Sequence, residues 1–277
     1  MNQRIQVIFI VGVIKKIQNR FRSKDEKVLA ANFSAEILQY GDILHVNILD
    51  SYKNISLKVI SLFEYMGSTC PHAKFYFKGD DDIILNPWNL INRLQVLSSQ
   101  IPNKLFLFGA NITDAAPIRK MKNDFLFSDT EIEKWNIPIY IYPCKFWGFP
   151  YLAGAGFIIS NAALKLLTIA GKCINLLYID DVMITGWMRY HLNIDLISNS
   201  DFSWVKLNID LHEAVKYILL PDLEPCELRI LWEQITNGKM SIDQPECKSA
   251  RSNAQSRSTG FDFPLNPFRF PFKLKVN

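Results

Sequence analysis

The sequence predicts an α/β fold in which a mostly parallel, twisted sheet is flanked by helices. Two observations lead to this prediction. Five strand-like apolar runs recur along the chain with segments of helical period between them, and this alternation is typical of βαβ units. The 277 residues are also 49% hydrophobic and 21% charged, a balance typical of globular proteins that bury a substantial core.

The strand-like runs are rich in β-branched and aromatic residues, which favour strands. The first run ends at Gly12, and its stretch of about ten apolar residues falls short of the ~20 that span a bilayer. We therefore interpret it as a buried strand. In chain order the runs are RIQVIFIVG (4–12), DILHVNIL (42–49), AKFYFKG (73–79), KLFLFGAN (104–111) and YLAGAGFIIS (151–160).

The helical segments carry an apolar residue every three or four positions. In residues 86–99, Asn86 is placed to cap a helix and Pro87 occupies its first turn. One face of that helix is expected to carry Trp88, Ile91, Leu94 and Leu97. The other segments of this kind are residues 26–40, 56–68, 160–171 and 227–235.

The chain divides into one domain and a tail. Residues 1–240 are expected to form the folded domain, and we find no internal repeat in them. Residues 241–277 are first polar and small (KSARSNAQSRSTG) and then rich in Pro and Phe without a regular period (FPLNPFRFPFKLKVN). Such composition predicts a poorly ordered tail.

Charge and cysteine spacing argue against two classes of function. The 31 basic and 27 acidic residues give a net charge of +4, and Lys and Arg are spread without a dense basic tract, so nucleic acid is not an expected partner. A zinc site is not expected either, because no CxxC pair occurs among Cys70, Cys144, Cys173, Cys226 and Cys247.

Three N-x-[ST] triplets, at Asn32, Asn54 and Asn111, modestly favour a protein of the secretory pathway. Such triplets also arise by chance. In an oxidising compartment the five cysteines could pair and leave one over, but the sequence does not fix their connectivity.

The run FYFKGDDDIILN sets three carboxylates between apolar residues. Ligands of an α/β sheet bind at the carboxyl ends of its strands, which is where this run places Asp80, Asp81 and Asp82. On an extended chain Asp80 and Asp82 would point the same way, so that two oxygen donors could approach one Mg²⁺ or Mn²⁺. A solvated acidic turn explains these three residues equally well.

A second acidic pair, Asp180 and Asp181, is also bounded by apolar residues, in LLYIDDVMITGW. A carboxylate near a metal–phosphate site could accept a proton from an attacking hydroxyl. Either aspartate could instead cap a helix that starts here, and the helix N-terminus would then favour the ionised carboxylate. Gly154 and Gly156, at the start of a strand, would let backbone or ligand approach closely, although a G-x-G triplet is weak evidence for binding.

Taken in order, five stretches resemble the β-1,3-glycosyltransferases of glycosyltransferase family 31, which include β-1,3-galactosyl- and β-1,3-N-acetylglucosaminyltransferases. They cover roughly residues 5–235 and are YGDILHVNILDSYKNISLKV, CPHAKFYFKGDDDIILN, APIRKMK, YLAGAGFIIS and YIDDVMITG. The resemblance implies a GT-A-type nucleotide-sugar-binding domain, an inverting reaction, a UDP-sugar donor, Mn²⁺ (or Mg²⁺), and a glycan acceptor on glycoprotein or glycolipid. It also implies the Golgi lumen and membrane association, although this chain has no spanning segment.

The same resemblance assigns roles to individual residues. Asp82 would be the direct metal ligand, with Asp80 at the metal and, together with Asp81, at the nucleotide-sugar. Asp181 would be the catalytic base. The donor or its nucleotide would further contact Gly154, Gly156 and, in the Pro-x-Arg segment, Arg119.

Three features depart from the family pattern. The chain starts at what resembles the family's second strand, so we expect an N-terminally shortened member that lacks the anchor and an Arg-rich segment. Pro221 stands where many members have a metal-binding His, and Asp222 or His212 could replace it. Trp187 stands where several relatives have a Cys.

The departures leave alternatives open. A catalytically degenerate member would bind glycan or a partner protein without turnover, and a metal-dependent phosphate hydrolase could use the same aspartates. The order of the motifs favours the transferase. The choice between galactose and N-acetylglucosamine as donor sugar stays open.

Overall fold

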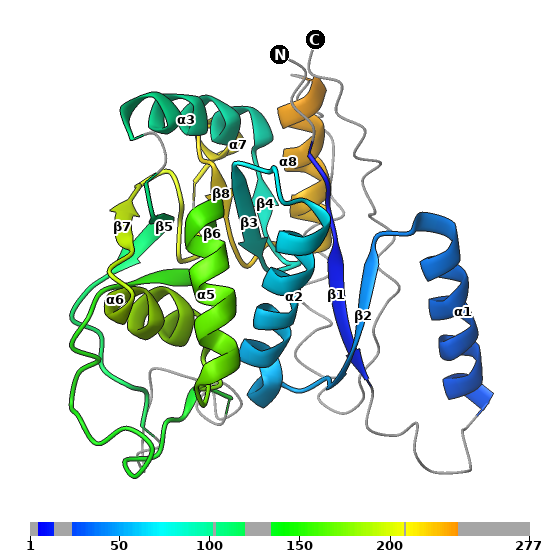
Figure 1. The fold of residues 1–277 in the computed structure, drawn as a ribbon. Coiled ribbons are helices and arrows are strands. Elements are labelled where there is room, and N and C mark those ends of the chain that lie inside the picture. Colours follow the sequence, from blue (N-terminus) through cyan, green and yellow to red (C-terminus); the bar gives the residue numbers. More distant parts are fainter. Residues whose placement is uncertain (1–4, 14–23, 102–103, 120–133, 208, 238–277) are drawn as a thin grey trace.

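The computed structural model describes residues 5–13, 24–101, 104–119, 134–207 and 209–237. Within them helices flank a central sheet, which confirms the α/β class (Figure 1). The tail expected at 241–277 lies outside the described residues.

The central sheet has four strands in the order β3-β6-β5-β7. Its strands are β3 (Phe75–Gly79), β6 (Tyr151–Ser160), β5 (Phe106–Ile112) and β7 (Asp195–Ser198). β6 runs antiparallel to both β3 and β5, whereas β5 and β7 are parallel. The prediction of a mostly parallel sheet is therefore wrong for this sheet, which is mixed. An apolar run that is buried on both faces carries no signal of strand direction.

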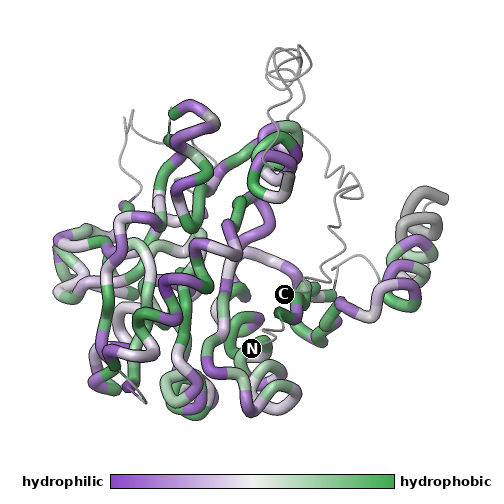
Figure 2. Tube along the Cα trace, turned by 90° about the horizontal axis from the view of Figure 1, so that it is seen from above, coloured by the Kyte–Doolittle hydropathy of each residue, from purple (hydrophilic) through white to green (hydrophobic). Residues whose placement is uncertain are grey.

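Two small sheets flank the central one. β1 (Phe9–Val13) pairs in parallel with β2 (Ile43–Leu49), and β4 (Ile84–Leu85) pairs antiparallel with β8 (Leu219–Leu220). Helix α1 (Lys24–Tyr40) stands to the side of the domain in both views (Figures 1 and 2). Its Phe33 meets His45 of β2 edge to face, with ring centroids 5.5 Å apart.

The two faces of the central sheet bury different side chains. Helices α2 (Ile55–Thr69) and α5 (Asn161–Cys173) and the π-helical segment η3 (Asp181–Met188) cover one face, where Leu107 of β5 points. Helix α3 (Pro87–Gln100) and β8 cover the other face, where Phe106 and Phe108 point. β5 thus alternates between two cores, as a strand period of two requires.

Helix α3 shows how local sequence sets an element. The Asn86 side-chain oxygen accepts hydrogen bonds from the backbone N–H groups of Trp88 and Asn89, each at 3.2 Å, so the predicted cap is confirmed. The buried side chains of the helix are Pro87, Leu90 and Leu97, and Leu94 is partly buried with them. The buried face therefore centres on Leu90, one position from the predicted Ile91.

The remaining elements are short apart from the last helix. They are η2 (Tyr52–Asn54), α6 (Arg189–His191), α7 (Leu211–Ala214) and α8 (Pro225–Asn237). Cys226 of α8 is disulfide-bonded, whereas Cys70, Cys144 and Cys173 are free. Among the helices of the described ranges, none combines the length and the apolar character that a membrane crossing needs.

Candidate active site

The site forms where β3 ends against β6. The two strands pair from Phe75 opposite Ser160 to Gly79 opposite Gly156, and the next backbone N–H, that of Asp80, donates to Ala155 O at 3.0 Å. The chain then bends through Asp81 and Asp82 before β4. This segment is therefore bent and not extended, and the approach of Asp80 and Asp82 to one cation stays a prediction.

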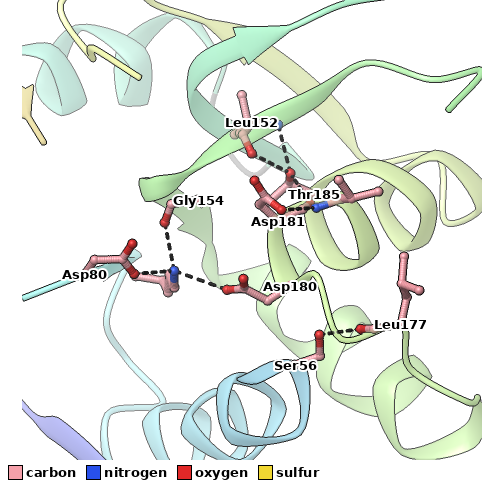
Figure 3. A network of polar contacts seen from close by, with 10 residues as sticks. Ser56, Asp80, Leu152, Gly154, Leu177, Asp180, Asp181 and Thr185 are labelled. Atoms are coloured by element: carbon pink, nitrogen blue, oxygen red, sulfur yellow. Dashed lines mark hydrogen bonds and ion pairs between the residues drawn. The ribbon is translucent and has the colours of Figure 1, made fainter. Parts of the chain in front are cut away.

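Lys78 joins the two acidic motifs, whose Asp80 and Asp180 lie on either side of Gly154 O in Figure 3. Its ammonium donates to Asp80 Oδ1 at 2.9 Å and to Gly154 O at 2.8 Å, and it lies 3.2 Å from Asp180 Oδ2. The lysine side chain is only 5% exposed. Sequence reasoning missed this residue, although its inward position in an apolar strand next to the aspartates was a usable signal.

Opposing effects act on the charge of Lys78. Burial lowers its pKa, but the negative charges of Asp180 and Asp80 and the hydrogen bond to Asp80 outweigh burial, so the pKa is raised. Lys78 is therefore a cation at neutral pH. Burial raises the pKa of Asp80, while Lys78 opposes that rise.

Asp181 is the first residue of η3, and its carboxylate is held by its own segment. Its Oδ1 accepts a hydrogen bond from the Val182 N–H at 2.7 Å. One turn on, the Thr185 hydroxyl accepts from the Leu152 N–H of β6 at 2.8 Å and lies 2.7 Å from Asp181 O. These contacts fix the start of η3 against β6 (Figure 3).

The start of a helical segment at the second acidic pair is confirmed, but neither aspartate caps it as expected. Asp180 makes no capping hydrogen bond and instead faces Lys78. Burial, followed by the charge of Asp180, raises the pKa of Asp181 to about 7. The expected stabilisation of the ionised form by the helix N-terminus is thus outweighed, and Asp181 has the pKa of a base that works near neutral pH.

Two tyrosines that sequence reasoning missed lie near this carboxylate. Tyr52 of η2 and Tyr151 at the start of β6 both have raised pKa values, because of burial and then because of the Asp181 charge. The Tyr52 hydroxyl also shares a hydrogen bond with the Trp135 side chain. Two neutral phenols, one of them hydrogen-bonded to an indole, thus lie near the candidate base.

Gly154 and Gly156 permit two close approaches. A Cβ atom at residue 154 would lie 3.2 Å from Asp181 Oδ2. A Cβ atom at residue 156 would lie 2.5 Å from Leu219 Cδ1 and 2.9 Å from Phe77 Cζ. The first glycine therefore clears space for the Asp181 carboxylate, and the second lets β6 pack on β8. Their contact with a donor stays a prediction.

The backbone of Asp82 contacts the loop that follows β8. The Leu223 N–H donates to Asp82 O at 3.1 Å. Partial burial, and then the charges of Asp80 and Asp222, raise the pKa of the Asp82 carboxyl. Pro221 is buried and offers no ligand, whereas Asp222 is exposed with a left-handed φ of 56°. Of the two suggested substitutes for a metal-binding His, the structure thus brings Asp222 near Asp82, and His212 lies exposed on α7.

The donor set fits an open cation site. In the part of the chain that the structure describes, no group of three or more His, Cys, Asp or Glu side chains is arranged to hold a metal by itself. Mg²⁺ and comparable cations, however, usually bind one or two carboxylates and take further ligands from water and substrate phosphates. Asp82, with Asp80 and Asp222 near it, offers such carboxylates.

Arg119 is occupied by backbone carbonyls. Its guanidinium donates to the oxygens of Ile137 and Tyr142, and to Cys144 O at 3.1 Å. These contacts organise the segment that leads into β6. The expected contact of Arg119 with the nucleotide stays a prediction, as does any role of the exposed Asp81.

These features define an α/β domain with carboxylates gathered at one sheet edge. Two of these carboxylates, those of Asp80 and Asp180, contact the buried ammonium of Lys78. The comparison with protein families identifies the domain. The model of the galactosyltransferase family matches residues 1–200, and the chain belongs to this family.

Named relatives agree with this assignment. The rat protein "UDP-GlcNAc:betaGal beta-1,3-N-acetylglucosaminyltransferase 7" is 33% identical over 238 residues, which cover 83% of this chain and 55% of the rat protein. The human "Beta-1,3-galactosyltransferase 1" is 27% identical over 200 residues, which cover 72% of this chain and 57% of the human protein. The chain therefore spans little more than half the length of these curated relatives.

Proposed function

We propose that this protein is an inverting β-1,3-glycosyltransferase, which moves galactose or N-acetylglucosamine from a UDP-sugar to a glycan hydroxyl. The observation that carries the proposal is the Asp181 carboxylate, whose pKa is raised to about 7 at the same sheet edge as Asp80. Family membership and the names of the relatives support the reaction class.

In the proposed reaction Asp181 accepts the proton of the acceptor hydroxyl as that oxygen attacks the anomeric carbon. The attack comes from the face opposite the nucleotide, so one displacement inverts the anomeric centre without a covalent intermediate. The Val182 N–H holds Asp181 Oδ1, which leaves Oδ2 beside Gly154 as the oxygen for the acceptor.

The donor would bind at the bend after β3. Asp82 and Asp80 would hold Mn²⁺ or Mg²⁺, with Asp222 as a further carboxylate, and Asp81, Gly154, Gly156 and Arg119 would serve the UDP-sugar. A bound divalent cation would neutralise the charge that grows on the leaving diphosphate. A β-galactoside is the first acceptor to test, because the rat relative's name includes it. The Golgi lumen and membrane association are part of this proposal and rest on the family.

The donor site is tested by calorimetry of UDP binding with and without Mn²⁺, on the unchanged protein and on Asp82→Ala. We expect Mn²⁺-dependent binding that the variant loses by about tenfold or more, because a charged ligand oxygen is removed. Lys104→Ala is the matched control, since its exposed ion pair with Asp195 lies at β7. The absence of binding by folded, unchanged protein would instead favour a degenerate member, the alternative that Pro221 suggests.

A further inference from the structure

Lys78 is a buried cation that the proposed reaction does not use directly. It stands on β3, two residues before Asp80, and its ammonium contacts three different segments. These are the bend after β3 through Asp80, the β6 backbone through Gly154, and the start of η3 through Asp180 (Figure 3). No other described ion pair includes a lysine as deeply buried as this one.

The geometry explains why Asp180 can be buried at all. Its side chain is 7% exposed, and within the described ranges its Oδ2 makes no hydrogen bond. A buried carboxylate without a counter-charge is strongly destabilising. The ammonium at 3.2 Å supplies that counter-charge, so Lys78 and Asp180 together form a fixed link between β3 and η3.

We propose that Lys78 is a positioning residue, which ties the Asp80 bend to the start of η3 and thereby holds the Asp181 carboxylate in its place and charge state. Lys78 touches neither reacting atom in this account and acts through Asp80, Gly154 and Asp180. This inference rests on the proposed function, in which Asp181 is the base.

The charged and titratable groups that face Asp181 come from five segments of the chain. Asp180 belongs to its own segment, Lys78 to β3, Asp80 to the following bend, and Tyr52 and Tyr151 to η2 and β6. Of these only Lys78 is a cation. Removing it leaves only the Val182 N–H to offset the repulsion from Asp180 and Asp80, so the Asp181 carboxyl should hold its proton to a higher pH.

The test is a ¹³C NMR titration of the Asp181 carboxyl in protein free of metal and donor, with the resonance assigned through Asp181→Asn. In Lys78→Met, which removes the charge and keeps an unbranched side chain, we expect the midpoint to rise by about half a unit to one unit. Lys172→Met is the matched control: it also removes one lysine from an ion pair, but from the exposed pair with Glu64, and we expect no shift. The acidic limb of the pH profile for sugar transfer should move with the midpoint.

An unchanged Asp181 midpoint in folded Lys78→Met would overturn the inference, whether or not the protein transfers sugar. If the Asp181 midpoint rises in Lys78→Met but the unchanged protein transfers no sugar, the link between Lys78 and Asp181 stands and the proposed function is rejected. If Lys78→Met does not fold, Asp180→Asn is compared with the double variant Lys78→Met/Asp180→Asn, in which no carboxylate is left unpaired at residue 180. A higher midpoint in the double variant supports the inference, and equal midpoints overturn it.

Discussion

At the scale of single residues, the site combines groups whose charges oppose one another. Asp181 is shielded from water and sits beside Asp180, so that its pKa is raised to about 7, far above the ordinary value for an aspartate. Keeping the Asp181 carboxylate ionised therefore costs free energy in the folded protein, and the Val182 N–H and the Lys78 charge offset part of that cost. Such a cost is typical of catalytic groups.

Replacement of Asp181 by Asn should therefore slow sugar transfer and stabilise the fold at the same time. We expect a loss of about 10²-fold or more in kcat and, above pH 7, a gain of about 1–2 kcal/mol in the free energy of unfolding, after a discount for solvent screening. Because the folded state holds the Asp181 proton more tightly than the unfolded state, the stability of the unchanged protein falls as pH rises from about 4 to 7. The gain should thus be absent near pH 4.

Chemical denaturation of both proteins at pH 4 and pH 8, without metal, measures this difference. Asp195→Asn is a suitable control, since Asp195 is an exposed partner of Lys104. An equal free energy of unfolding for Asp181→Asn and unchanged protein at pH 8 would contradict the raised pKa.

At the scale of elements, β6 serves both the fold and the site. It lies between β3 and β5 in the sheet, and its Leu152 N–H binds Thr185 of η3. Its two glycines make different contacts: Gly154 faces the base, whereas Gly156 faces apolar side chains. The same small substitution should consequently have two different effects.

Gly154→Ala places a Cβ atom 3.2 Å from Asp181 Oδ2. We expect kcat to fall by about tenfold or more, because a carboxylate displaced by a few tenths of an ångström loses its alignment, with little change in Tm. Gly156→Ala places its Cβ atom 2.5 Å from Leu219 Cδ1 and should destabilise by about 1–3 kcal/mol through overpacking. Thermal unfolding and initial rates of both variants check the contrast. Equal falls in kcat together with equal Tm values for the two variants would argue against this contrast.

The sequence predicted most elements because their signals are local. The Asn86 cap, the apolar period of α5 and the five strand-like runs all appear at or near the expected residues. The direction of β6 was not predictable, since an apolar run reads alike in both directions. The contacts of Lys78 were missed, because they join residues that only the folded chain brings together. Asp222 was suggested as one of two substitutes for a metal-binding His, but only the fold distinguishes it from His212 by placing it near Asp82.

At the scale of the whole molecule, two apolar cores on opposite faces of the central sheet hold the acidic edge in place. One core joins α2, α5 and η3 to the sheet, and the other joins α3 and β8 to it. η3, which carries Asp181, contributes Met183, Ile184 and Met188 to the first core. The position of the base therefore depends on the packing of the whole domain.

Leu107→Ala tests this dependence, because Leu107 is fully buried in the core that η3 shares. We expect a loss of about 2–5 kcal/mol in the free energy of unfolding from the cavity that it leaves. Leu57→Ala is the control: Leu57 is 47% exposed on α2, and its loss should cost well under half as much. Denaturant titration measures both, and similar losses would contradict the assignment of the core.

Inverting β-1,3-transfer with Asp181 as the base is tested most directly by identifying the linkage that the protein forms on a glycan. The protein is incubated with UDP-N-acetylglucosamine or UDP-galactose, Mn²⁺ and a panel of acceptors that includes a terminal β-galactoside, and the product is analysed by NMR. We expect a new β-linked sugar on a 3-hydroxyl, which Asp181→Asn forms at least about 10²-fold more slowly. A product with retained α configuration, or the same rate from Asp181→Asn, would contradict it.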